Sequence, residues 1–180
     1  MRAETDRARL EDLMVRFGTE VKGPGRIYLT GGSTAVLYGW RSMTIDVDIK
    51  ADPEPPGLFE AIVVLKESIG INIELAAPDD FIPALPGWRD RSLFILRSGE
   101  IDFLHYDFYA QALAKLERGH ARDMDDVDAM LRLALVDVGR LRELFEAIEP
   151  ELNRYPAIDP VSFRVAVVAL RDPPRQPPHR

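Results

Sequence analysis

The residues best suited to chemistry are Gly31-Gly32-Ser33, followed after twelve residues by Asp46-Val47-Asp48. Residues two apart on a strand point to the same face of a sheet, so Asp46 and Asp48 present two carboxylates side by side. Such a pair is destabilising unless a cation neutralises it, and hard carboxylate oxygens suit Mg²⁺. A Gly-Gly-Ser turn between a strand and a helix offers N–H groups and a hydroxyl to phosphate oxygens. Together the two motifs indicate phosphoryl chemistry.

Each motif also has a purely structural interpretation. An isolated Asp-x-Asp strand is usually a solvated face, and an isolated Gly-Gly-Ser is usually a turn. The order and spacing of the two motifs favour a functional site, as does the placing of Ile45, Val47 and Ile49 on the opposite face of the strand.

Composition limits the class of protein. The chain has 180 residues, 46% hydrophobic and 29% charged, which predicts one globular domain, or one domain with a helical extension. Its net charge of −7 argues against binding nucleic acid through general neutralisation of phosphates. The absence of cysteine excludes disulfides, thiolate metal sites and thiol catalysis. A charged N-terminus and the lack of a long apolar run predict a soluble, cytoplasmic protein that does not enter a membrane.

Hydrophobic periodicity predicts the elements that must position the two motifs. In the first half it predicts helices over 3–17, 33–38 and 58–68, strands over 26–29, 44–49 and 72–76, a proline-rich loop over 78–90, and a hairpin of strands 92–96 and 101–104. Ser33 is predicted to cap the second helix. In the second half it predicts helices over 107–118, 123–135, 138–152 and 161–170.

These elements predict an α+β fold of α/β character, with a mixed sheet flanked by helices. The core is expected over residues 1–106, a helical region packed on that core over 107–171, and a disordered proline-rich tail over 172–180.

The pattern Gly32-Ser33, twelve residues, Asp46-x-Asp48 resembles the signature of the polymerase-β-like nucleotidyltransferase superfamily. The stretch from Gly31 to Asp48 is most similar to small bacterial members, namely the minimal nucleotidyltransferases and the abortive-infection-type toxins of toxin–antitoxin pairs. The resemblance covers roughly residues 26 to 130 and implies the nucleotidyltransferase fold.

The resemblance also implies a third acidic residue on a neighbouring strand. Glu74 follows the helix after Asp48, where the minimal enzymes place theirs. Asp102 keeps the preferred residue type, and the apolar Ile101 and Phe103 flank it on a predicted strand. We slightly favour Asp102 as the ligand that joins Asp46 and Asp48 on the metal, although either candidate could be a surface carboxylate.

The segment from Ala114 to Val127 is similar to the toxin-like branch. This similarity implies that Lys115 contacts a triphosphate and that Asp123 and Asp126 orient it or the basic residues. Asp123 and Asp126 lie three apart on one helix face, and acids there could equally serve a helix N-terminus. Arg41, five residues before Asp46, could bind a phosphate or tie down its own loop.

The resemblance therefore implies an enzyme dependent on Mg²⁺ or Mn²⁺ that moves a nucleoside monophosphate from a nucleoside triphosphate to an acceptor hydroxyl, on tRNA or protein. It implies that Gly31, Gly32 and Ser33 help to bind the nucleotide, and that an antitoxin-like protein is a partner. The alternatives are a non-catalytic nucleotide-binding or protein-interaction module on the same fold, and a purely structural domain.

Overall fold

The computed structural model describes residues 4–172, which form two compact units. The first unit contains the described residues up to Asp80, together with Gly87–Asp107. The second contains Phe81–Pro86 and the described residues from Phe108 onward. Residues 173–180, which are most of the predicted tail, lie outside the described residues.

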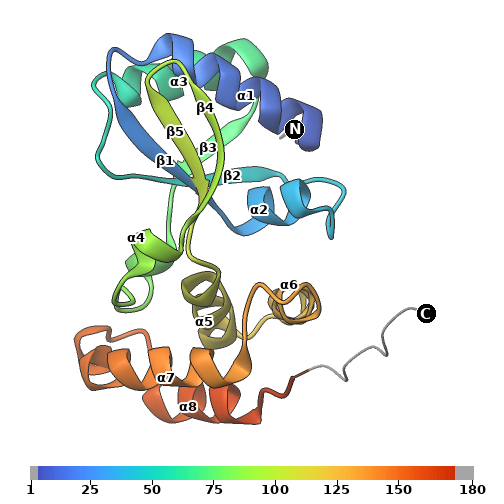
Figure 1. Cartoon of the computed structure of the whole chain (residues 1–180), viewed down its shortest axis with the longest axis vertical. Coiled ribbons are helices and arrows are strands. Elements are labelled where there is room, and N and C mark those ends of the chain that lie inside the picture. The colour runs from blue at the N-terminus through green and yellow to red at the C-terminus, as the bar shows by residue number, and fades with distance from the viewer. Residues whose placement is uncertain (1–3, 173–180) are drawn as a thin grey trace. The chain divides into compact units, whose positions relative to one another are not determined.

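The first unit is built on a five-stranded mixed sheet, which confirms the predicted α+β class (Figure 1). The strand order is β3-β2-β1-β5-β4, with β1 antiparallel to β2 and parallel to β5, β2 parallel to β3, and β4 antiparallel to β5. The strands are β1 (Gly25–Thr30), β2 (Asp46–Ala51), β3 (Asn72–Leu75), β4 (Leu93–Ser98) and β5 (Ile101–His105). The helices are α1 (Arg7–Glu20), α2 (Gly31–Tyr38), α3 (Leu58–Ile69), α4 (Trp88–Arg91) and the 3₁₀ turn η1 (Pro78–Asp80).

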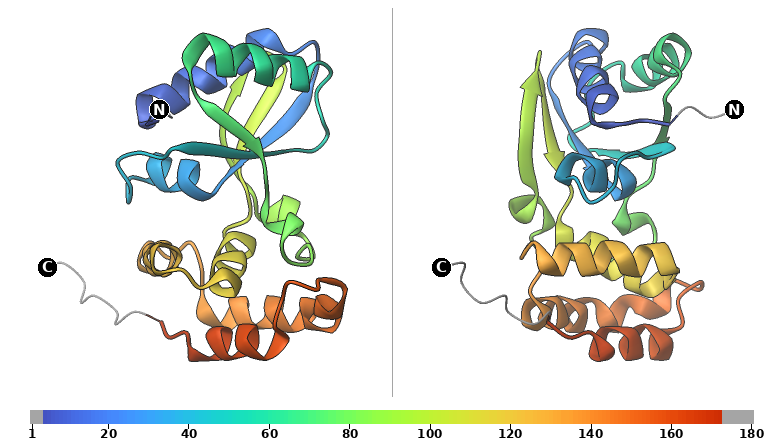
Figure 2. Two further views of the ribbon diagram at one scale, coloured as in Figure 1. Left: turned by 180° about the vertical axis from the view of Figure 1, so that it is seen from behind. Right: turned by 90° about the vertical axis from the view of Figure 1, so that its right-hand side faces the viewer.

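One face of the sheet is apolar and is covered by α1 and α3 (Figures 1 and 2). The alternation of the strands sends Val47 and Ile49 of β2 to this face, where each is almost completely buried. Neighbouring strands and the inner faces of the two helices complete the core with Leu10, Leu13, Phe17, Ile27, Leu29, Leu58, Leu65, Ile73 and Phe103. This burial settles which side chains of β2 point to the opposite face, because a slip of one residue would expose the apolar set.

The opposite face of the sheet is polar. Across it, Asp48 lies opposite both Thr30 of β1 and Glu74 of β3, and the next row pairs Lys50 with Tyr28. The far row pairs Arg26 of β1 with Asp102 of β5. The polar face therefore carries acidic groups at both ends of its strands.

The predicted loop over residues 78–90 contains two short helical segments, η1 and α4. The aromatic ring of Trp88, only 5% exposed, stacks on Tyr106 at 4.5 Å between ring centroids and meets the edge of Tyr28 at 5.0 Å. A helix of one turn is too short to be predicted from hydrophobic periodicity. The burial of Trp88 stabilises the short helix α4.

The second unit is helical. It contains α5 (Phe108–Arg118), α6 (Ala121–Arg132), α7 (Val138–Ile148), the 3₁₀ segment η2 (Glu149–Arg154) and α8 (Pro160–Ala169). Phe145 of α7 meets Phe163 of α8 edge to face at 4.8 Å in the core of the unit. Among the described residues, no helix combines the length and the apolar character that a bilayer crossing requires.

His105, at the end of β5, is a buried titratable group in the first unit. Its side chain lies with Nδ1 at 3.1 Å from Thr34 Oγ1 and its ring at 4.8 Å from the ring of Tyr38. It lines a pocket of about 360 Å³ whose other polar residues are Arg7, Glu11 and Tyr38. Burial lowers the pKa of His105 from its usual 6.5 to about 4.

We expect the free energy of unfolding to fall as the pH drops below 6.5. The unfolded chain protonates His105 near pH 6.5 and the folded chain only near 4, so this contribution is complete above 6.5 and is lost toward 4. A difference of this size corresponds to roughly 3 kcal/mol. Urea unfolding between pH 7.5 and 4.5, followed by tryptophan fluorescence, measures it; His105→Gln should flatten the dependence, while the exposed His120→Gln should not. An equal slope in His105→Gln would contradict the assignment.

Candidate active site

Asp46 and Asp48 share the polar face of β2. Both side chains are partly exposed, whereas Val47 between them is fully buried. The predicted pairing of the two carboxylates on one face therefore agrees with the alternation of burial along the strand.

The neighbouring strand β3 adds two more polar side chains to this face. In the parallel register, Asn72 lies opposite Asp46 and Glu74 lies opposite Asp48. The Nδ2 atom of Asn72 donates to Asp46 Oδ1 and to Glu74 Oε1, both at 2.7 Å. β2 and β3 thus gather three carboxylates and one amide in two adjacent rows.

A glycine turn closes the site at the end of β1. Gly31 begins α2 with a φ of +60°, and a Cβ added to it would lie 3.1 Å from Asp48 Oδ2. A Cβ on Gly32 would lie 2.2 Å from Thr44 Oγ1, which is a prohibitive overlap. The turn therefore needs glycine at both positions, and it brings the N-terminus of α2 beside Asp48.

The next residues of the predicted site take different places. Ser33 is not the helix cap, because α2 begins two residues earlier with Thr30 at the N-cap position. Its side chain is completely buried, and its hydroxyl has no hydrogen-bond partner within the described chain. Arg41 is partly buried, and its guanidinium lies 3.8 Å from where a Cβ of Gly32 would be. Arg41 therefore borders the glycine turn.

Asp102 lies away from this site, contrary to our slight preference for it as the third ligand. It pairs with Arg26 at the start of β1, whereas Asp48 pairs with Thr30 at its end, four residues or roughly 13 Å along the strand. Arg97 holds Asp102 through two bonds of 2.6 and 3.0 Å, and this hydrogen bonding lowers the pKa of the carboxyl below its usual range. Glu74 is the candidate that the sheet brings to Asp48.

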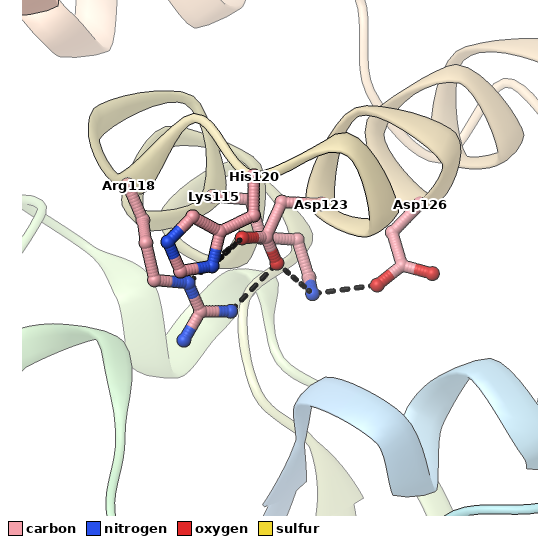
Figure 3. Close-up of polar contacts among 5 residues, drawn as sticks. All are labelled: Lys115, Arg118, His120, Asp123 and Asp126. Carbon is pink, nitrogen blue, oxygen red and sulfur yellow. Dashed lines mark hydrogen bonds and ion pairs between the residues drawn. The ribbon is translucent and has the colours of Figure 1, made fainter.

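The remaining predicted residues form an ion-pair network in the second unit (Figure 3). Lys115 of α5 places Nζ at 2.6 Å from Asp126 Oδ2 and 3.3 Å from Asp123 Oδ1, both on α6. Arg118 makes two further bonds to Asp123, at 2.6 and 2.8 Å. The side chains of Lys115, Asp123 and Asp126 are each at most 8% exposed. The network therefore joins α5 to α6 by buried charges.

The electrostatics of Asp123 follow from these contacts. Burial by itself would raise the pKa of Asp123, but the hydrogen bonds and charges of Arg118 and Lys115 outweigh it and lower the pKa. The carboxylate consequently stays ionised inside the unit. Asp123 also lies in the first turn of α6, as the helix N-terminus interpretation predicts, and both Asp123 and Asp126 contact basic side chains of α5.

Asn72 and Thr44 contribute contacts at the site that the sequence motifs do not predict. Asn72 lies two residues before Glu74 on the same strand, so the two-residue period of a strand predicts that both side chains point to the same face. Thr44 forms a two-way backbone bridge with Thr5, at 2.7 and 2.9 Å, and donates its hydroxyl to the carbonyl of Asp46 at 3.0 Å. No local sequence pattern predicts this bridge, because Thr5 and Thr44 are 39 residues apart in the chain.

The donor set suits a hard divalent cation. Asp46 and Asp48 supply carboxylate oxygens on one face, and the absent Cβ of Gly31 leaves space beside Asp48. Within the part of the chain that the structure describes, no three His, Cys, Asp or Glu side chains are arranged to hold a metal by themselves. Mg²⁺ commonly takes only one or two carboxylates and completes its shell with water and substrate phosphates. The residues therefore fit Mg²⁺ bound together with a phosphorylated ligand.

We expect Lys115→Met to destabilise the protein by about 3–5 kcal/mol, because it removes the buried ammonium group that contacts the buried carboxylates of Asp123 and Asp126. Urea unfolding followed by far-UV circular dichroism measures the change. Tryptophan fluorescence reports the first unit alone, because Trp40 and Trp88 both lie there. Arg132→Met, an exposed position on α6, removes the same charge and should change stability by less than about 0.5 kcal/mol. Equal stability of the two variants would contradict a structural role for the network.

Comparison with protein-family models matches residues 19–165 to the family described as nucleotidyltransferase of unknown function (DUF6036). The match spans the glycine turn, the carboxylates of β2 and β3, and the α5–α6 network. Neither the curated proteins nor the solved structures contain a significant match. Since the family model covers most of the chain and the fold has the expected mixed sheet, the chain belongs to this nucleotidyltransferase family.

Proposed function

We propose that the polar face of β2 and β3 transfers a nucleoside monophosphate from a nucleoside triphosphate to an acceptor hydroxyl. The observation that carries the proposal is the register that sets Asp48 opposite Glu74 and against Gly31. Family membership supports the general activity of nucleotidyl transfer. The metal, the acceptor and the assignment of residues below are our own.

Asp46 and Asp48 would hold Mg²⁺ or Mn²⁺. When bound, this ion supplies charge neutralisation for the phosphates and for the leaving pyrophosphate. The N–H groups at the start of α2 and the guanidinium of Arg41 bind the phosphate oxygens. Glu74, exposed and opposite Asp48, takes the proton of the acceptor hydroxyl as it attacks the α-phosphorus. The chain thus positions the two reactants and provides the base.

We assign no substrate contact to Lys115, because its ammonium group is buried between two carboxylates. Three arginines of the first unit also form ion pairs with carboxylates, which limits how strongly they can attract a nucleic-acid acceptor. Arg89 pairs with Asp52, Arg91 with Asp107, and Arg97 with Asp102. Paired cations contribute little net attraction to a long polyanion.

The acceptor that we propose is therefore a hydroxyl on a protein or at a tRNA end, contacted over a short stretch. A toxin-like role with an antitoxin-like protein partner belongs to the same proposal, and it rests on the resemblance of the segment from Gly31 to Asp48 and of the segment from Ala114 to Val127. Incubation with α-labelled nucleotides and a mixture of tRNA and proteins identifies the acceptor by what becomes labelled.

We expect Asp46→Asn with Asp48→Asn to lower nucleotide transfer by at least about 100-fold while the thermal transition is retained, because the two charges are lost without a change in shape. Transfer is measured as pyrophosphate release and label incorporation in the presence of Mg²⁺. Glu60→Gln with Glu67→Gln removes two charges from the exposed face of α3 and should have no effect. Undiminished transfer by the Asp46/Asp48 variant would refute the site.

The alternative of a non-catalytic nucleotide-binding module is favoured by one observation: within the described residues, no three acidic or histidine side chains are arranged to hold a metal together. Calorimetry with each nucleoside triphosphate separates the two functions. Binding that depends on Asp46 and Asp48 without release of pyrophosphate would support the module and not the enzyme.

Glu74→Gln and Asp102→Asn distinguish the two candidates for the third carboxylate. We expect Glu74→Gln to lower the transfer rate by about 100-fold, which is typical for the loss of a general base. Asp102→Asn should leave transfer unchanged and cost less than about 1 kcal/mol of stability, because it loses only a partly exposed ion pair with Arg97. The reverse ranking of the transfer rates would restore Asp102 as the third carboxylate.

A further inference from the structure

Asn72, on the polar face of the sheet, donates a hydrogen bond to each of two carboxylates. It lies on the edge strand β3, opposite Asp46 and two residues before Glu74, so both carboxylates are within reach of its short side chain. The two bonds are both 2.7 Å, the length of a strong hydrogen bond to a charged acceptor. Asn72 therefore links the two strands at the candidate metal site.

The orientation of the amide follows from its neighbours. Ionised carboxylates only accept hydrogen bonds, so the NH₂ group and not the carbonyl oxygen of Asn72 must face Asp46 and Glu74. Both N–H groups are used, one for each carboxylate. On each acid one oxygen, Oδ1 of Asp46 or Oε1 of Glu74, is engaged by the amide, and the second oxygen is not part of these bonds.

The neutral charge of the amide matters as much as its two donors. A lysine or arginine at this position would satisfy the same oxygens but would neutralise the carboxylates and repel an incoming cation. A carboxylate would add to the repulsion, and an apolar side chain would remove the hydrogen bond that holds the exposed side chain of Glu74. An uncharged donor orients both acids and leaves the negative charge of Asp46 for a metal and that of Glu74 for a proton.

We infer that Asn72 is a positioning residue that orients Asp46 for binding of the divalent cation and holds Glu74, the proposed base, beside it, an inference that rests on the proposed function. It contacts the metal ligand rather than the reactants, as do the hydrogen-bonding partners of metal ligands in general, whose loss typically lowers metal affinity by 10- to 100-fold. It also makes Glu74 part of the same assembly as Asp46, although β3 contributes only four residues to the sheet.

The test compares the affinity of the nucleotide-free protein for Mn²⁺, measured by electron paramagnetic resonance of the free ion. Asn72→Leu removes both donors at similar volume and should weaken Mn²⁺ binding by about tenfold or more. Asn72→Gln keeps the amide on a longer side chain and should recover most of the affinity. Asn153→Leu is the matched control, because Asn153 is exposed on η2 and is the only other asparagine of the chain.

Three outcomes decide the inference. Weaker Mn²⁺ binding in Asn72→Leu, together with a higher Mg²⁺ requirement for transfer, supports positioning. Unchanged Mn²⁺ affinity with a lowered melting temperature would mean that Asn72 only stabilises the sheet, and would overturn the inference while the proposed function stands. If the wild-type protein binds no Mn²⁺, the inference and the metal assignment of the proposed function both fail.

Discussion

The repulsion between carboxylates gathered on one face of a sheet is the constraint around which the first unit is arranged. Asp46 and Asp48 must share a face because they lie two apart on β2, and the parallel pairing with β3 adds Glu74 opposite Asp48. Three like charges in adjacent rows destabilise a fold unless other groups compensate. Here the compensation comes from the amide of Asn72 and from the positive end of α2. Both are uncharged, so neither cancels the negative charge of the carboxylates.

The opposite face of the same strands supplies the stability that such an arrangement requires. Val47 and Ile49 are buried with the apolar sides of α1 and α3, and this burial prevents β2 from slipping in register. A slip by one residue would turn both carboxylates into the core and both aliphatic side chains into water. The chemistry of one face is therefore specified by the packing of the other.

In the second unit, buried carboxylates are compensated by positively charged side chains. Two basic side chains of α5 and two acidic side chains of α6 neutralise each other. The ion pairs Lys115–Asp123, Lys115–Asp126 and Arg118–Asp123 are each 3.3 Å or shorter. A buried network of this kind is directional, so it specifies how two helices meet, and it leaves little charge for a ligand. The two units therefore differ in how their acidic side chains are held: by an amide on the sheet and by buried cations between α5 and α6.

The local features of the site could be predicted from the sequence. The face shared by Asp46 and Asp48 follows from the two-residue period of a strand, and the glycine turn follows from Gly31 and Gly32 after a strand, because both are properties of short segments. The same holds for the α+β class, since alternating helices and strands leave few alternatives. The choice between Glu74 and Asp102 could not be made in this way. Both sit on strands with apolar neighbours, and only the pairing of β2 with β3 and of β1 with β5 separates them.

Tertiary structure also decided the partners of single side chains. Three contacts join segments that only folding brings together. Asn72 bridges Asp46 and Glu74, Thr5 pairs with Thr44, and Lys115 lies between two carboxylates. Periodicity determines which way a side chain points, because it depends on the backbone of one segment. It does not determine what the side chain meets, because register and helix packing arise from the whole core at once.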